Sequence, residues 1–194
     1  MDYLLWFSIG YLSGSLPFGY LLGRLKGIDL TQIGSGSTGA TNVLRNLGNG
    51  FALLTLVFDI AKGFMPVYLA LKFRNNEFVI LFCAISCILG HSKSIFLKFK
   101  GGKSSATGLG ILIAICWQAA VITSLIWTIV VITSRYSSLG SIIVIPLTPL
   151  WLFLFHKPMI YIVLTIFAAV YIVLIRHREN IQRLIKGTEL KIGQ

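Results

Sequence analysis

Three short polar segments interrupt an otherwise apolar chain, and each combines residue types that suit phosphate binding. The first runs from Ile33 to Arg45 and contains three glycines, two serines and two threonines. Glycine lets the backbone adopt positive φ and approach a ligand closely. A helix opening at Thr41-Asn42 would direct N–H groups at an anion, and the guanidinium of Arg45 matches phosphate geometry. Taken alone, the segment is also compatible with a flexible loop.

The second segment runs from Phe99 to Gly108, where Gly101-Gly102-Lys103 precedes a run of hydroxyl residues. A Gly-Gly turn followed by lysine and hydroxyls at the start of an apolar span resembles a phosphate cradle. It is not a Walker A loop, because the G-x-x-x-x-G-K-[ST] spacing requires glycine where this chain has Leu97. ATP hydrolysis is therefore not predicted. A basic anchor that holds the membrane topology is the alternative interpretation.

The third segment, from Arg176 to Glu189, contains the only histidine of the C-terminal tail. If the segment is helical, His177 and Asn180 share one face, while Glu179 and Arg183 form an i, i+4 pair on another. The alternative interpretation is a basic tail that lies on lipid headgroups.

The composition requires these segments to be positioned by membrane helices. Hydrophobic residues make up 56% of the chain, charged residues only 12%, and the mean hydropathy is +0.84; soluble domains carry about 25% charged residues. We predict an all-α, polytopic integral membrane helix bundle that forms a single domain over residues 1–194. The start of the chain lacks a basic run and a clear cleavage site, which favours a retained first span. Apolar segments lie at positions 3–23, 51–71, 78–97, 106–134, 139–155 and 158–175.

The segment 106–134 decides the predicted topology. As one helix it would be roughly 43 Å long, too long for a single pass without strong tilt. Two passes that turn near Trp117-Gln118 give about seven transmembrane helices, with the N-terminus outside and the C-terminus in the cytoplasm. This arrangement leaves Lys72, Arg74 and Lys157 outside and places these basic residues inside: Arg24, Lys26, Arg45, Lys93, Lys98, Lys100, Lys103, Arg135, Arg176, Arg178, Arg183, Lys186 and Lys191.

Charged and thiol side chains elsewhere have simpler interpretations. The net charge of +11 suits basic loops beside anionic lipid, and no basic run is interleaved with aromatics for stacking on nucleic-acid bases. Asp59 and Lys62, three residues apart within a span, are predicted either to form a bundle-facing ion pair or to mark a functional site. Cys83 and Cys87 are expected to pack as small hydrophobic residues.

Because all three polar segments fall on the predicted inner face, we expect one site there for a phosphorylated substrate, with a lipid-soluble partner arriving from the bilayer. The residues concerned are Gly34-Ser35-Gly36 with Gly39-Ala40-Thr41-Asn42, Lys100-Gly101-Gly102-Lys103 with Ala106-Thr107, and His177-Arg178-Glu179-Asn180-Ile181 with Arg183-Leu184. In order and spacing they resemble the signature motifs of the PlsY family, the bacterial acyl-phosphate-dependent glycerol-3-phosphate acyltransferases.

The resemblance implies a seven-span enzyme of the bacterial inner membrane with its active site facing the cytoplasm. It implies transfer of a fatty acyl group from acyl phosphate to the 1-hydroxyl of glycerol 3-phosphate, an early step of phospholipid biosynthesis that releases phosphate and lysophosphatidic acid. The expected partners are acyl phosphate, glycerol 3-phosphate and membrane lipid, with no nucleic acid, no metal and no cofactor. The sequence is compatible with a monomer.

The resemblance also points to individual residues. Arg45 and Lys103 are expected to clamp the phosphate of glycerol 3-phosphate, and the Ser35-Gly36-Ser37 turn to hold the acyl phosphate head. His177 and Asn180 are expected to orient the attacking hydroxyl, with a substrate phosphate oxygen taking its proton. The catalytic set is Ser35, His177 and Asn180; the predicted substrate-binding residues are Gly36, Ser37, Thr41, Asn42, Arg45, Gly102, Lys103 and Ser141.

The chain departs from the family pattern at three positions. Ser37 replaces the usual asparagine, Ser104 the usual glycine after Gly-Gly-Lys, and Ser94 a frequent proline. The first two changes are expected to affect the geometry of the phosphate loops and the rate more than the reaction class.

Rival functions find less support. A transporter or channel for a small phosphorylated anion would account for the Asp59–Lys62 pair, but a transport site is expected near the midplane rather than on one face. A metal-dependent synthase of the CDP-alcohol type needs clustered aspartates, whereas this chain has only Asp2, Asp29 and Asp59. Soluble acyltransferases for this acceptor use a His-x-x-x-x-Asp pair, which is absent here. A purely structural subunit would leave the three motifs unexplained.

Overall fold

The computed structural model describes residues 2–74 and 76–193, and over these residues the chain is helical without a β-strand. One isolated antiparallel bridge joins Ser94 to Lys100. The chain forms two compact units, Met1–Ala114 and Ile115–Gln194.

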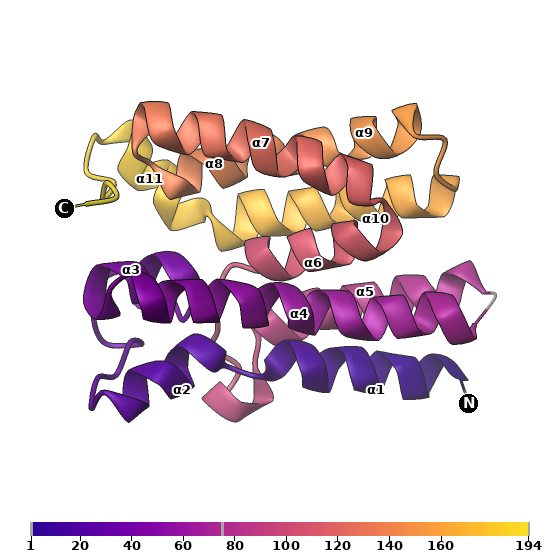
Figure 1. The fold of residues 1–194 in the computed structure, drawn as a ribbon, viewed down its shortest axis with the longest axis horizontal. Coiled ribbons are helices and arrows are strands. Elements are labelled where there is room, and N and C mark those ends of the chain that lie inside the picture. The colour runs from indigo at the N-terminus through magenta and orange to yellow at the C-terminus, as the bar shows by residue number, and fades with distance from the viewer. Residues whose placement is uncertain (1, 75, 194) are drawn as a thin grey trace. The chain divides into compact units, whose positions relative to one another are not determined.

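The first unit packs its helices through small residues. Gly10 and Gly14 of α1 lie so close to the backbone of α5 at Cys83 and Cys87 that a Cβ at either glycine would overlap it. Small residues allow such approach between membrane helices. Both cysteines are fully buried, which confirms that they pack as small hydrophobic residues. The helices (Figure 1) are α1 (Asp2–Ser15), α2 (Phe18–Leu25), α3 (Ala40–Leu47), α4 (Asn49–Phe73), α5 (Glu77–Ser92), the 3-10 turn η1 (Ile95–Leu97) and α6 (Ser105–Ile115).

The second unit is an up-and-down set of helices (Figure 1). α7 packs against α8, and α9 against α10. The tail returns to the start of this set, because Ile192 N donates to the carbonyl of Arg135 (2.8 Å) and Arg135 Nη2 donates to the carbonyl of Ile192 (3.0 Å). The elements are α7 (Trp117–Ser134), α8 (Ser137–Val144), the 3-10 turn η2 (Ile145–Leu147), α9 (Thr148–Leu154), α10 (Met159–Val170), the π-helical η3 (Tyr171–Arg176) and α11 (Arg178–Ile185).

Four helical segments in the described part of the chain are long and apolar enough to cross a membrane, and they confirm four predicted spans in type and position. They are Asn49–Phe73, Trp117–Ser134, Ser137–Leu154 and Met159–Arg176. Two shorter apolar helices are Glu77–Ser92 and Ser105–Ile115. The predicted division of 106–134 is also confirmed: the helix breaks at Cys116 (φ −157°, ψ 89°), one residue before the expected turn. The count of seven and the orientation remain predictions.

Two predicted spans were wrong in continuity or extent. The helix expected over 3–23 is interrupted after Ser15, because Pro17 lacks the N–H needed to continue the hydrogen-bond ladder. The helix expected over 78–97 ends at Ser92, where the chain turns into η1 and Lys98 and Phe99 adopt positive φ.

The backbone carbonyls at the interruption after α1 accept hydrogen bonds from two side chains elsewhere in this unit, one on α4 and one in the loop after α5. Lys62 Nζ donates to the carbonyl of Leu16 (2.8 Å), and Ser94 Oγ donates to the carbonyl of Ser15 (2.6 Å). Lys62 also pairs with Asp59 at 2.7 Å, and both side chains are almost fully buried. Of the two interpretations left open by the sequence, the structure shows the ion pair, which satisfies backbone groups freed by the break.

Candidate functional site

The loop before α3 is built around the side chain of Asn42, which is 1% exposed. Asn42 Nδ2 donates to the carbonyls of Leu30, Ile33 and Ser37 at 3.2, 3.2 and 2.8 Å. Its Oδ1 accepts from the backbone N–H of Ser35 (3.0 Å) and from Asn46 Nδ2 (3.2 Å). One side chain therefore holds the whole loop. The predicted role of Asn42 as a substrate ligand does not fit this geometry, because both its polar atoms are used inside the loop.

Two glycines allow this loop to close. Gly34 has φ +59°, and a Cβ there would overlap Asn42 Oδ1. Gly36 has φ +65° and is exposed. Before them, Asp29 accepts hydrogen bonds from the hydroxyl and the backbone N–H of Thr31 (2.6 and 3.0 Å). These bonds, with Arg24 nearby, hold the pKa of Asp29 below its ordinary value.

The other predicted residues of this segment are partly accessible. Ser35, Ser37, Thr41 and Arg45 are half-buried, and Ser37 Oγ accepts from the N–H of Gly39 (3.3 Å). The helix begins at Ala40, one residue before the expected Thr41, with Gly39 as its N-cap. Thr41 and Arg45 lie four residues apart on this helix.

The second segment forms a turn that lies against α5. Gly102 N donates to the carbonyl of His91 (3.1 Å), and a Cβ on Gly102 would overlap His91 Nε2. Gly101 meets the carbonyl of His91 in the same way. Here glycine is needed for close approach, since neither residue has positive φ. Gly102 is buried and Lys103 is half-buried.

The structure shows how serine is accommodated at position 104, where the family pattern has glycine. Its φ of +65° is a conformation that glycine adopts without strain. Its hydroxyl donates to the carbonyl of Ile88 (2.9 Å), and the residue is 1% exposed. This hydrogen bond attaches the strained serine to α5, and α6 follows directly.

In the second unit, a π-helical turn presents His177. The carbonyl of Ile172 accepts from both the backbone N–H (3.0 Å) and the ring Nδ1 (2.9 Å) of His177. Because a carbonyl can only accept, the ring carries a proton on Nδ1, and in the neutral form Nε2 is the acceptor nitrogen. π-helical turns are frequent at functional sites. His177 is 2% exposed and caps α11, whose predicted helical structure is confirmed.

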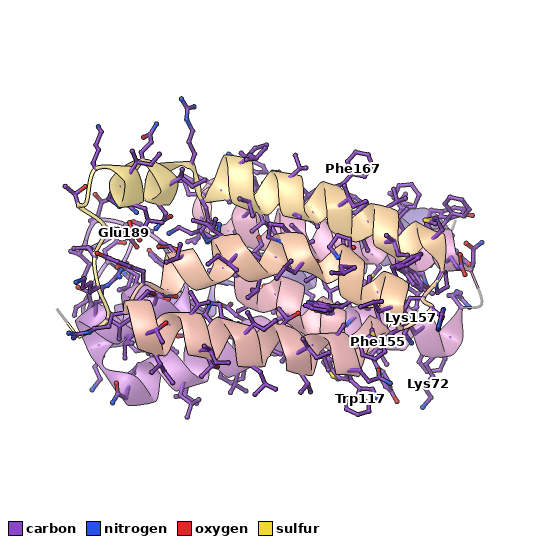
Figure 2. All side chains as sticks on the ribbon, turned by 90° about the horizontal axis from the view of Figure 1, so that it is seen from above. Lys72, Trp117, Phe155, Lys157, Phe167 and Glu189 are labelled. Atoms are coloured by element: carbon purple, nitrogen blue, oxygen red, sulfur yellow. The ribbon has the colours of Figure 1, made fainter. Side chains whose placement is uncertain are left out.

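Glu189 fixes the amide of Asn180 and was not assigned a role from the sequence. Its carboxylate accepts from Asn180 Nδ2 (2.6 Å), Ser138 Oγ (2.7 Å) and Arg183 Nε (2.7 Å). Figure 2 shows Glu189 at the end of this unit opposite to Lys157. Arg183 is also 3.8 Å from Glu179, the predicted i, i+4 partner, but Glu189 is nearer. Glu189 lies in a loop after α11, so helical periodicity in the sequence could not indicate its role.

The hydrogen bond between Glu189 and Asn180 favours ionisation of the carboxylate and fixes which way the amide faces. Burial opposes ionisation of Glu189, but the three donated hydrogen bonds hold its pKa below the ordinary value. Since an ionised carboxylate only accepts, the NH₂ group of Asn180 must face it. Asn180 Oδ1 is then turned the other way, is buried, and has no hydrogen-bond partner among residues 2–74 and 76–193.

The predicted residue Ser141 lies three residues after Ser138 on α8 and is 6% exposed. In the second unit, Glu189 joins the start of α8 to the start of α11, because it accepts hydrogen bonds from Ser138 and from Asn180. In the first unit, the loop around Asn42 and the start of α6 lie toward the end opposite to the N-terminus (Figure 1).

Comparison with known proteins identifies the family. The sequence profile of the glycerol-3-phosphate acyltransferase family matches residues 4–187. The glycerol-3-phosphate acyltransferase of Gloeobacter violaceus is 43% identical over 191 residues, which cover 96% of this chain and 93% of the relative. Glycerol-3-phosphate acyltransferase 2 of Thermotoga maritima is 38% identical over 197 residues, which cover 100% of this chain and 98% of the relative. The chain belongs to the glycerol-3-phosphate acyltransferase family.

Two solved structures show that this chain also shares its fold with a member of the family. PlsY (YgiH), an integral membrane glycerol 3-phosphate acyltransferase, in its glycerol 3-phosphate form has a TM-score of 0.94 and 38% identity, covering 100% of this chain and 96% of that one. Its lysophosphatidic acid form has a TM-score of 0.92 and 37% identity. These findings confirm the resemblance drawn from the motifs, and together with the apolar helices they make this acyltransferase a membrane protein.

Proposed function

We propose that this acyltransferase moves a fatty acyl group from acyl phosphate to the 1-hydroxyl of glycerol 3-phosphate, giving lysophosphatidic acid and phosphate. The observation that carries the proposal is the pair of turns in the first unit, Gly34-Ser35-Gly36 and Gly101-Gly102-Lys103. Donor and acceptor each carry a phosphate group, so the reaction needs two phosphate-binding turns. Ser35, Gly36 and Ser37 hold the donor head. Arg45 and Lys103 clamp the acceptor phosphate, and Thr41 and Gly102 line these turns.

The second unit supplies acceptors for the hydroxyls of glycerol 3-phosphate. His177 Nε2 accepts from one hydroxyl in the neutral ring, and Asn180 Oδ1 accepts from the other. Support comes from the hydrogen bond that Asn180 Nδ2 donates to Glu189, because it leaves the buried Asn180 Oδ1 without a partner among the described residues. Two fixed acceptors for two hydroxyls would select the 1-hydroxyl as nucleophile by position. Ser141 contributes a further hydroxyl to this set, and Asn42 acts by holding the first loop.

Little activation of the donor is required. The 1-hydroxyl oxygen attacks the acyl carbonyl carbon, the bond from that carbon to the phosphate oxygen breaks, and phosphate departs as a good leaving group. The hydroxyl proton passes to a phosphate oxygen of the substrate, because Arg176 and Arg178 beside His177 oppose a positive charge on its ring. N–H and hydroxyl groups of the first loop stabilise the charge that develops on the carbonyl oxygen.

We further propose that residues 1–194 act as one membrane domain with about seven spans, N-terminus outside, in the bacterial inner membrane. Basic loops on the cytoplasmic side support this orientation. Within the second unit, the exposed Trp117 and the half-buried Lys157 lie at the end opposite to Glu189 (Figure 2), as expected for residues at the outer interface.

The test is an assay with purified protein in lipidic mesophase, palmitoyl phosphate, glycerol 3-phosphate and a metal chelator. Phosphate and lysophosphatidic acid should appear in equal amounts, and palmitoyl-CoA should not replace palmitoyl phosphate as donor. Product from palmitoyl-CoA alone would contradict the proposed donor. Absence of product from folded protein with either donor would contradict the reaction and direct attention to the transporter hypothesis.

A further inference from the structure

A buried polar cluster lies beneath the Gly101-Gly102-Lys103 turn and is not used by the reaction described above. It consists of Asp59, Lys62, His91 and Thr107, whose side chains come from α4, α5 and α6 and are all at least nine-tenths buried. Burying such a cluster costs desolvation energy, and apolar replacements of buried ion pairs are often equally stable. The hydrogen bond from Lys62 to the Leu16 carbonyl gives the Asp59–Lys62 pair a structural role, but it does not account for His91 and Thr107.

The cluster fixes the ring of His91. Thr107 Oγ1 lies 3.0 Å from His91 Nδ1, and Asp59 Oδ1 lies 3.7 Å from the same nitrogen. Thr107 and Asp59 thus hold the Nδ1 side of the ring from two directions. Lys62 neutralises Asp59 at 2.7 Å.

The fixed ring is the surface on which the glycine turn rests. Any Cβ on Gly102 would overlap His91 Nε2, while the N–H of Gly102 donates to the carbonyl of the same histidine (3.1 Å). The ring thus fixes how closely Gly102 approaches α5. Because Lys103 is the next residue, the ring also fixes where the Lys103 backbone lies. Displacement of the turn by a fraction of an ångström would move the Lys103 ammonium from its phosphate.

We propose that His91, held by Asp59 and Thr107, is a positioning residue that sets the Gly101-Gly102-Lys103 turn for binding the phosphate of glycerol 3-phosphate. This inference rests on the proposed function. His91 does not touch the substrate. Its effect passes through the turn, so it should change the KM for glycerol 3-phosphate and leave the KM for acyl phosphate unchanged.

The test is steady-state kinetics with each substrate varied, beside thermal unfolding of each variant. His91→Ala and Thr107→Val should each raise the KM for glycerol 3-phosphate about 10-fold, with little change in the KM for palmitoyl phosphate. Thr107→Ser, which keeps the hydroxyl, should restore the KM relative to Thr107→Val. Ser86→Ala, a buried change on the same helix as His91 but outside the cluster, is the matched control for packing and should leave both KM values unchanged.

A suppression experiment separates positioning from stability. Gly102→Ala should raise the KM for glycerol 3-phosphate because its methyl group meets the His91 ring, and His91→Ala should remove that overlap. The double variant should therefore bind glycerol 3-phosphate at least about 5-fold better than the product of the two single effects predicts. Effects that multiply, or equal increases in both KM values, would overturn the inference. Absence of product from the wild-type protein would instead overturn the proposed function, and this inference with it.

Discussion

The two units hold their functional side chains by different means. In the first unit, the neutral amide of Asn42 bonds five groups of its own loop and of α3 at 2.8–3.2 Å. In the second unit, the carboxylate of Glu189 receives three side-chain hydrogen bonds at 2.6–2.7 Å, one of them from Arg183. The first arrangement shapes a backbone, and the second orients side chains.

The roles proposed above for the two units account for the difference. A phosphate-binding turn offers backbone N–H groups, so its main chain has to be fixed, and a buried amide with donors and acceptors can bond several carbonyls. A hydroxyl-orienting site offers single side-chain atoms, which a charged acceptor fixes more firmly, because charge-assisted hydrogen bonds are shorter and stronger. The first unit should therefore depend on exact shape and the second on charge.

The largest expected effect comes from Asn42→Asp, which keeps the shape and removes the donors. Three backbone carbonyls, at least partly buried, would then face a carboxylate, and kcat/KM should fall by about 100-fold or more as the loop rearranges. Kinetics with both substrates and thermal unfolding measure the effect. An Asn42→Asp variant with normal kinetics would show that the loop does not depend on this amide.

Glu189→Gln should have the next largest effect, because it keeps the shape of the side chain that bonds Ser138, Asn180 and Arg183 and removes its charge. The neutral amide bonds Arg183 less well and no longer fixes which way the Asn180 amide faces, so kcat should fall roughly 10-fold or more. Glu179→Gln, which alters the exposed partner of Arg183, is the control and should be close to wild type. Equal effects of the two changes would remove the special role of Glu189.

Acid should weaken the hydrogen bonds that Glu189 accepts in the second unit. The pKa of Glu189 is lower in the folded protein than its ordinary value of 4.5, so its stabilising contribution is complete above that value and is lost as pH falls through the folded pKa. The difference in unfolding temperature between wild type and Glu189→Gln should be constant from about pH 7 to about pH 5 and shrink below about 4.5. A difference independent of pH would contradict ionisation of Glu189.

The smallest expected effect concerns Ser104→Gly. Glycine relieves the strain of φ +65° but loses the hydrogen bond to Ile88 and adds freedom to the unfolded chain, so stability should change by less than about 1 kcal/mol. Ser104→Ala keeps the strain and loses the hydrogen bond, so it should be the less stable of the two variants. Thermal unfolding measures both variants. A Ser104→Ala variant more stable than Ser104→Gly would contradict the strain at φ +65°, and one more stable than the wild type would contradict the role given to the hydroxyl.

The sequence predicted the helical class and the family, because hydropathy and motif spacing are local signals. It failed where a distant partner decides. Pro17 itself marks the interruption after α1, but the side chains of Lys62 and Ser94 that bond the carbonyls next to it are distant in the sequence. The end of α5 at Ser92 depends on the turn that folds back on His91. Asn42 and Glu189 could not be assigned correctly, since the sequence does not show which polar atoms a loop consumes.

The most direct test of the central claim compares glycerol 3-phosphate with glycerol, an acceptor that lacks the phosphate. If Arg45 and Lys103 clamp that phosphate, Arg45→Ala and Lys103→Ala should lower kcat/KM for glycerol 3-phosphate by about 100-fold and leave the slow reaction with glycerol nearly unchanged. Asn180→Ala should lower kcat/KM for both acceptors by a similar factor. If all three variants changed both acceptors alike, the division of roles between phosphate clamp and hydroxyl orientation would be wrong.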